Sequence, residues 1–126
     1  MKTSMMMSLI LFLMISTCYS QNRISSWDSE KIRSVQVESR TTGNEIMILL
    51  LDERDDIEKV MSYLRKVDFR DLNGQNVDPL DWQYRITFNG LRDQVYLFEN
   101  YAFIGKTTFL IDTKVVKEFN NLLKEL

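Results

Sequence analysis

Carboxylate side chains come closest to forming a chemical site in this 126-residue chain. Four of them flank one polar stretch between predicted elements: Asp68, Asp71, Asp78 and Asp81. Two carboxylates at a suitable separation hydrolyse glycosides, and several together bind Ca²⁺. Surface connections are also polar simply because they face water. We therefore keep a carboxylate-dependent hydrolase as the least favoured of three functional hypotheses.

Two other stretches are weaker candidates for ligand sites. One is an acidic run: Asp52, Glu53, Asp55, Asp56 and Glu58. It lacks the alternating ligands and the central glycine of an EF-hand loop. The start of a helix explains it better, because the helix dipole favours negative charge there. The stretch Gly105–Thr108, GKTT, is similar to the end of a phosphate-binding loop. That motif needs a glycine where Asn100 stands, and it opens a helix, whereas a strand is predicted here.

The residue types that usually carry catalysis are missing from the sequence. It contains no histidine, which is the commonest general base and neutral metal ligand. Its one cysteine, Cys18, lies in a segment that we expect to be removed or lipidated. Neither a G-x-S-x-G elbow nor an S-x-x-K pair is present. We therefore predict a protein that is not an enzyme and that uses no cofactor and no metal.

The first twenty residues have the order of a secretory signal peptide. Lys2 gives a positive charge, an apolar run extends from Met5 to Ile15, and small and polar residues follow. The apolar run is shorter than the roughly 20 residues that a transmembrane helix needs. We therefore expect the protein to be exported.

Two ways of processing this leader remain open. Cleavage after Ser20 would release a secreted or periplasmic chain that begins at Gln21. The alternative treats residues 15–18 as a lipobox, so that lipidated Cys18 anchors the protein to a membrane. Thr17 is atypical before a lipidated cysteine. We favour cleavage after Ser20.

The rest of the chain is predicted to be one domain, residues 31–126, preceded by a flexible lead-in at residues 21–30. The formal charge of the whole sequence is −2, with both signs mixed along the chain. This pattern argues against nucleic acid, which needs a basic face. No basic amphipathic helix for a membrane surface is present either. Contact with a membrane is expected only through the leader or a lipid anchor.

In the first half of the domain, the pattern changes from strand to helix. Val35 and Val37 alternate with polar neighbours, which predicts a first strand. Residues 46–51 are apolar at every position, which is typical of a central strand covered on both faces. An apolar stripe then predicts a helix with Asp52 as its N-cap: Ile57, Val60, Met61, Leu64 and Val67.

The second half follows a polar connection at residues 68–81. Trp82, Tyr84, Ile86 and Phe88 alternate with polar residues, and Asn89-Gly90 begins a hairpin whose four-residue loop would set Val95 opposite Ile86. Residues 101–112 form one or two further strands, broken near Gly105. A final helix, capped by Asp112, has an apolar face: Val115, Val116, Phe119, Leu122, Leu123 and Leu126.

These elements predict an α+β fold with the order β-β-α-β-β-β-α. Sequential strands joined by short turns form a mainly antiparallel sheet, here of about five strands, and two helices cover one face of it. The result is a two-layer sandwich whose other sheet face is partly open.

Aromatic residues concentrate in the strands of the second half, and alternation cannot place all of them under the helices. Those left outside would form a patch that marks an interaction surface; the other reading, which we rate higher, places them in the core or in a homodimer contact. The candidate residues for this surface are Trp82, Tyr84, Tyr96, Phe98, Tyr101 and Phe103.

The whole processed chain resembles small secreted or lipid-anchored single-domain bacterial proteins of unknown role, built as strand-strand-helix-strands-helix. The stretches that carry the resemblance are patterns of hydrophobicity: DDIEKVMSYL at 55–64, YRITF at 84–88, VYLF at 95–98 and IDTKVVKEFNNLL at 111–123. The resemblance implies a bacterial origin and an envelope or extracellular location. It implies no catalytic residues.

We therefore predict an exported, non-enzymatic module that binds an unknown protein or peptide through the aromatic face of its sheet. A carrier with a small apolar pocket between sheet and helices is the second hypothesis, and the hydrolase at residues 68–81 is the third.

Overall fold

The computed structural model describes residues 23–40, 43, 45–72 and 81–126. Within these residues one seven-stranded sheet forms, with the strand order β2-β1-β4-β5-β6-β7-β3 and antiparallel pairing at every step. Its strands are β1 (Ser34–Arg40), β2 (Ile46–Leu51), β3 (Arg70–Asp71), β4 (Tyr84–Asn89), β5 (Gln94–Leu97), β6 (Tyr101–Ile104) and β7 (Thr107–Leu110).

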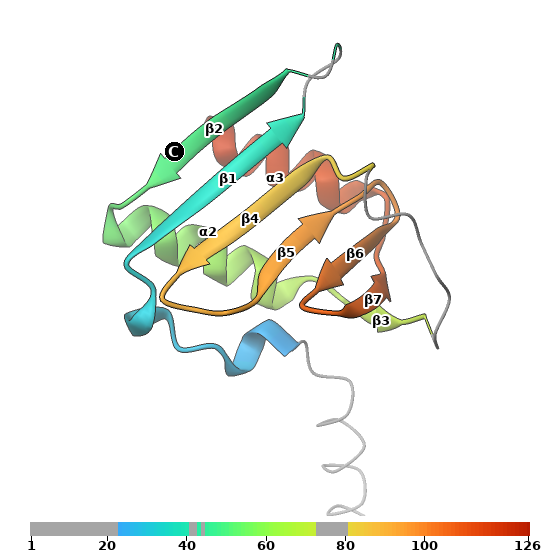
Figure 1. Cartoon of the computed structure of the whole chain (residues 1–126), viewed down its shortest axis with the longest axis horizontal. Helices are drawn as coiled ribbons and strands as arrows, with labels where there is room; N and C mark the ends of the chain where they lie inside the picture. Colours follow the sequence, from blue (N-terminus) through green and yellow to red (C-terminus); the bar gives the residue numbers. More distant parts are fainter. Residues whose placement is uncertain (1–22, 41–42, 44, 73–80) are drawn as a thin grey trace, which may run out of the picture.

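Two α-helices, α2 (Arg54–Lys66) and α3 (Lys114–Lys124), lie on the same face of this sheet (Figure 1). The predicted α+β class is confirmed. The sheet has more strands than the expected five or so, for two reasons. Residues 101–110 fold as two strands that turn at Gly105, and Arg70 and Asp71, predicted as part of a polar connection, pair with β7 at the far edge.

The core lies between the helices and the sheet. The predicted stripe of α2 is confirmed, because Ile57, Val60, Met61 and Leu64 are all buried. The helix begins one residue later than predicted: Glu53, and not Asp52, is the N-cap, and no side chain caps it. At α3 the N-cap is Thr113 and not the predicted Asp112, although the Asp112 carboxylate accepts a hydrogen bond from the Lys114 amide at 3.0 Å.

The described part of the predicted flexible lead-in, from residue 23 onward, packs onto the domain. It forms two short 3₁₀ helices, η1 (Arg23–Ser26) and η2 (Ser29–Lys31). Ile24 is fully buried, and the Trp27 ring meets the Phe88 ring edge-on at 5.3 Å. Arg65 donates to the Trp27 carbonyl at 2.9 Å and so fastens this segment to α2. The packed part of the chain therefore starts before residue 31.

The hairpin between β4 and β5 has the predicted register, with Ile86 opposite Val95. The alternation in β4, however, breaks at its start. Gln83 donates its N–H to Leu97 in β5, at 2.8 Å, while its carbonyl accepts from Arg40 in β1, at 3.0 Å. In a regular antiparallel strand both groups of a residue point to the same neighbour, so the backbone at Gln83 is irregular in the manner of a bulge.

The prediction for residues 46–51 is wrong. They form β2, an edge strand, and only β1 pairs with it among the described residues. Leu51 is buried, but the other side chains are exposed on both faces: Ile46 48%, Met47 63%, Ile48 64%, Leu49 39% and Leu50 60%. An all-apolar run fits a strand covered on both sides, but nothing in the run itself determines how many neighbours the strand acquires.

Among the described residues no helix has the length and apolar character needed to cross a membrane. The predicted leader at residues 1–20, with Cys18, lies outside the described residues, as does Asp78.

Candidate functional site

The sheet face opposite α2 and α3, here called the open face, collects most of the aromatic residues that the sequence singled out. Tyr96 in β5 pairs with Phe103 in β6, and Phe98 lies beside Tyr101 at the turn that joins these strands. The irregular backbone at Gln83 brings Trp82 to the same face, although Tyr84, two residues later, points to the helices. We call Trp82, Tyr96, Phe98, Tyr101 and Phe103 the open-face cluster.

The rings of the open-face cluster contact one another in two groups. Phe98 stacks on Tyr101 with centroids 4.4 Å apart and meets Phe103 edge-on at 5.5 Å. Trp82 meets Tyr96 edge-on at 6.4 Å. Phe98 and Trp82 are buried within the cluster, whereas Tyr96, Tyr101 and Phe103 remain partly exposed. Only these three rings therefore offer surface to another molecule.

Two arginines approach the ring of Trp82. The guanidinium carbon of Arg40, at the end of β1, lies 4.4 Å from the ring centroid, and that of Arg85 in β4 lies 5.1 Å from it. Such cation–π contacts stabilise a site by about 0.5–1 kcal/mol each when exposed. They hold Trp82 and both arginines in one arrangement on the open face.

Arg85 also forms an ion pair with Glu38, its cross-strand neighbour in β1. Glu38 is only 8% exposed, and the Gln36 side-chain amide lies 3.5 Å from its carboxylate. The hydrogen bond from Arg85 holds the pKa of Glu38 below its usual value of 4.5, although burial acts in the opposite direction. The carboxylate is therefore ionised at neutral pH and balances the charge of Arg85.

A short chain of polar contacts continues from the open-face cluster along β5 to β4. The Tyr96 hydroxyl donates to the Gln94 side-chain carbonyl at 2.9 Å, and the Gln94 amide donates to the Thr87 hydroxyl at 3.1 Å. These contacts fix the direction of the Tyr96 ring. The open face thus combines fixed rings, two arginines and satisfied polar groups.

Tyr84 is the one candidate aromatic residue that the structure separates from the others. It lies on the helix side, where its ring meets Phe119 edge-on at 5.0 Å and its hydroxyl donates to the Asn120 side chain at 2.9 Å. Burial raises its pKa above the usual 10.0. The sequence assigned Tyr84 to the same alternating set as Trp82, and the irregularity at Gln83 is what separates the two.

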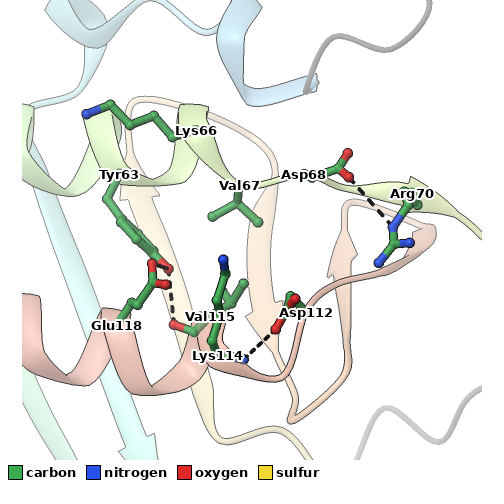
Figure 2. A pocket seen from close by; sticks show the side chains of 9 residues that line it. All are labelled: Tyr63, Lys66, Val67, Asp68, Arg70, Asp112, Lys114, Val115 and Glu118. Carbon is green, nitrogen blue, oxygen red and sulfur yellow. Dashed lines mark hydrogen bonds and ion pairs between the residues drawn. The ribbon is translucent and has the colours of Figure 1, made fainter.

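A groove of about 450 Å³ lies on the other side of the molecule, between the end of α2 and the start of α3 (Figure 2). Charged side chains of both signs line most of it. The Tyr63 hydroxyl lies 3.2 Å from both the Val115 carbonyl oxygen and the Glu118 carboxylate, and burial, aided by Glu118, raises its pKa. Because side chains of both charge signs line this groove, and Asp68 pairs with Arg70 at 3.7 Å, its positive and negative charges largely offset each other.

Of the four aspartates considered for hydrolysis, the three that the structure describes lie on separate elements. Asp68 lines the groove, Asp71 ends β3 and pairs with Phe109, and Asp81 lies exposed before β4. Across the described part of the chain, no group of three or more carboxylate or cysteine side chains is arranged to hold a metal ion.

The exposed apolar edge at β2 was missed by sequence reasoning, which placed this strand at the centre of the sheet. A second groove, of about 280 Å³, runs beside it on the helix face, where Met47 and Leu49 face Leu123 and Lys124 of α3. The available signal was the charge at both ends of the run, at Glu45 and Asp52, but such charges flank central strands as well.

No family model, no curated protein and no solved structure is significantly similar to this chain. The resemblance to small exported bacterial proteins therefore stays a prediction, and function is argued from the site alone.

Proposed function

We propose that this protein is a non-enzymatic module that binds another polypeptide through the open face of its sheet. The observation that carries the proposal is the open-face cluster, in which partly exposed aromatic rings stand beside two arginines that are fixed against Trp82. Tyr, Trp and Arg are the residue types that dominate binding energy at protein interfaces. Rings that are already held in place lose little side-chain entropy when a partner arrives.

The arrangement of the face supports a polypeptide partner over a small ligand. The partly exposed rings of Tyr96, Tyr101 and Phe103 extend over two neighbouring strands, and the ion pair of Glu38 and Arg85 continues the surface toward β1. A small molecule is usually enclosed by a concave pocket, whereas a broad strip of this kind suits a protein surface or an extended peptide. The carrier and hydrolase hypotheses stay predictions.

We further propose that the chain acts outside the cytoplasm, after export directed by its first twenty residues. Intact mass of the protein recovered from its host distinguishes the two processing routes. A chain that begins at Gln21 supports cleavage after Ser20, and a chain that begins at a lipidated Cys18 supports the anchored form. A chain that retains residue 1 would contradict export by a cleaved leader.

Photo-cross-linking in the host tests the binding face. A photoreactive phenylalanine analogue at position 103 is expected to give a discrete adduct with a second protein, and the same analogue at Leu122 on α3 is the control. Adding Tyr96→Ser should weaken the adduct at position 103. Adducts of equal yield from both positions, or none from either, would contradict the proposal.

With the captured partner purified, Phe103→Ser should weaken its binding by about tenfold or more, as is typical of a central aromatic contact. Leu122→Ser should leave the affinity unchanged, although it lowers the stability because Leu122 packs against the core. Binding is therefore measured at a temperature at which circular dichroism shows that both variants are folded.

A further inference from the structure

The outer edge of β2 exposes backbone groups as well as apolar side chains. Arg40 in β1 donates its N–H to the Gln83 carbonyl, on the side of β4, and successive residues of an antiparallel strand point to alternate neighbours. Residues 35, 37 and 39 of β1 therefore pair with Leu51, Leu49 and Met47 of β2 by hydrogen bonds. It follows that Ile46, Ile48 and Leu50 direct their N–H and C=O groups away from the sheet.

We propose that this edge pairs with β2 of a second copy, so that two seven-stranded sheets join into one across a two-fold axis. The proposal goes beyond the binding function assigned to the open face and does not rest on it. An antiparallel pair with Ile48 opposite the partner's Ile48 places Ile46 opposite the partner's Leu50. All three outward-facing residues then become hydrogen-bonded pairs, each of which exchanges two backbone hydrogen bonds.

The side chains of β2 suit another copy of β2 better than an ordinary strand. A strand with one buried face and one face in water alternates apolar and polar residues. If such a strand paired with β2, its polar side chains would lie beside the apolar side chains on one face of β2. β2 has apolar residues on both faces. In the two-fold pair, Ile46, Ile48 and Leu50 of both copies meet on the open-face side, while Met47 and Leu49 of both copies meet on the helix side.

Charge at the ends of β2 selects the register. With Ile48 on the axis, Glu45 stands opposite the partner's Leu51, and no charge faces another within the ladder. A shift that puts Leu49 on the axis would set Glu45 opposite the partner's Glu53, and like charges directly across a strand pair are destabilising. Both registers set five of the six apolar residues against apolar partners, so charge decides between them.

The groove beside β2 gives this pair a second contact. It is lined on the helix face by Met47, Leu49 and Leu123, and its floor includes Val37 and Tyr84. In the two-fold arrangement the grooves of both copies face each other across the axis, so the Met47 and Leu49 side chains of each copy fill space in the other. Both open-face clusters then lie on the same side of the joined sheet, which would let the pair bind two sites at once.

The first test uses the protein purified after expression of the full chain, with its N-terminus identified by intact mass. Sedimentation should give the mass of two copies at about 100 μM, well above the micromolar Kd that an interface of modest area is expected to have. Hydrogen exchange should show the amides of Ile46, Ile48 and Leu50 protected at high concentration and exposed on dilution. The amides of Met47, Leu49 and Leu51 should stay protected throughout. A monomer at the high concentration, or outward amides that exchange fast there, would overturn the proposal.

Variants at Ile48 test the register. Ile48→Pro removes only an outward-facing N–H, which an edge strand tolerates, and it should give a folded monomer, while Ile48→Val should remain a dimer. In a Cys18→Ser background, Ile48→Cys should form a disulfide between copies, since hydrogen-bonded pairs lie about 5.5 Å apart between Cα atoms. A folded Ile48→Pro variant that still dimerises would refute self-pairing of β2, and cross-linking from Leu49→Cys in place of Ile48→Cys would refute this register.

Discussion

The Glu38 carboxylate and the Arg85 guanidinium form an ion pair across β1 and β4 on the open face, where Arg85 also lies over Trp82. Replacing Glu38 by Gln leaves Arg85 without its counter-charge in a half-buried position. We expect Glu38→Gln to lower the free energy of unfolding by about 1–2 kcal/mol at pH 7, because the amide can still accept a hydrogen bond from Arg85 but a hydrogen bond to a neutral group is weaker than one to a charged group. Urea denaturation followed by tryptophan fluorescence measures the difference.

The same variant should show a specific pH dependence. The pKa of Glu38 is lowered in the folded state, so the stability that it contributes is fully present above its unfolded value of about 4.5 and is lost as the pH falls through the folded value. The difference between wild type and Glu38→Gln should therefore shrink below pH 4.5. Glu99→Gln, at the exposed turn between β5 and β6, is the control and should have little effect at pH 7. A difference that stays constant down to pH 3 would show that the ion pair does not stabilise the fold.

A β-carbon at Gly90 would overlap the carbonyl oxygen of Lys31, and the residue has φ +109°. Gly43 has a similar φ, +113°, but has open space around it. Both Gly→Ala variants force alanine into an unfavourable backbone conformation, which should lower the free energy of unfolding by about 1–2 kcal/mol. Only Gly90→Ala also pushes η2 away from the β4–β5 turn. We expect Gly90→Ala to be the less stable by more than about 1 kcal/mol, and equal melting temperatures would contradict the close contact.

The periodic elements could be predicted from the sequence because their signals are local. The stripe of α2 repeats every three or four residues, and Asn89-Gly90 with its flanking alternation fixed the hairpin register that sets Val95 opposite Ile86. These features depend on neighbours a few residues apart. The helix packing and the α+β class follow from them, since two amphipathic helices and a run of antiparallel strands bury their apolar faces together.

The edge position of β2 and the face of Trp82 could not be predicted in this way. Six apolar residues look alike in a central strand and in an edge strand, and the neighbours of β2 are decided by β4, more than thirty residues away, which takes the other side of β1. The sheet face on which the Trp82 side chain lies depends on one backbone irregularity at Gln83. No residue type in this stretch predicts that irregularity. Five of the six aromatic residues singled out from the sequence nevertheless lie on the open face, and four of these are in or next to β5 and β6.

Ile24 should contribute to stability as a core residue does, although it precedes the predicted start of the domain. It is fully buried, and its segment is held by Arg54, which donates to the carbonyls of Ser29 at 2.7 Å and Ile32 at 2.9 Å. We expect Ile24→Ala to cost about 2–5 kcal/mol and Ile24→Val about 0.5–1.5 kcal/mol. Chemical denaturation measures both, and a loss below about 0.5 kcal/mol for Ile24→Ala would mean that η1 does not pack as described.

Ionisation of Tyr63 should make the protein less stable at alkaline pH. Its pKa is raised in the folded state, first by burial and then by Glu118, so the stability that its neutral hydroxyl contributes is present below pH 10 and is lost as the pH rises above it. At pH 7, Tyr63→Phe should cost about 1 kcal/mol through the hydrogen bond lost to Val115 or Glu118. That cost should shrink above pH 10, because wild type alone must keep Tyr63 protonated.

Glu118→Gln should lower the ionisation midpoint of Tyr63, seen by ultraviolet absorbance, without returning it to 10, since burial is the larger cause. A midpoint unaffected by Glu118→Gln would show that the carboxylate does not act on Tyr63.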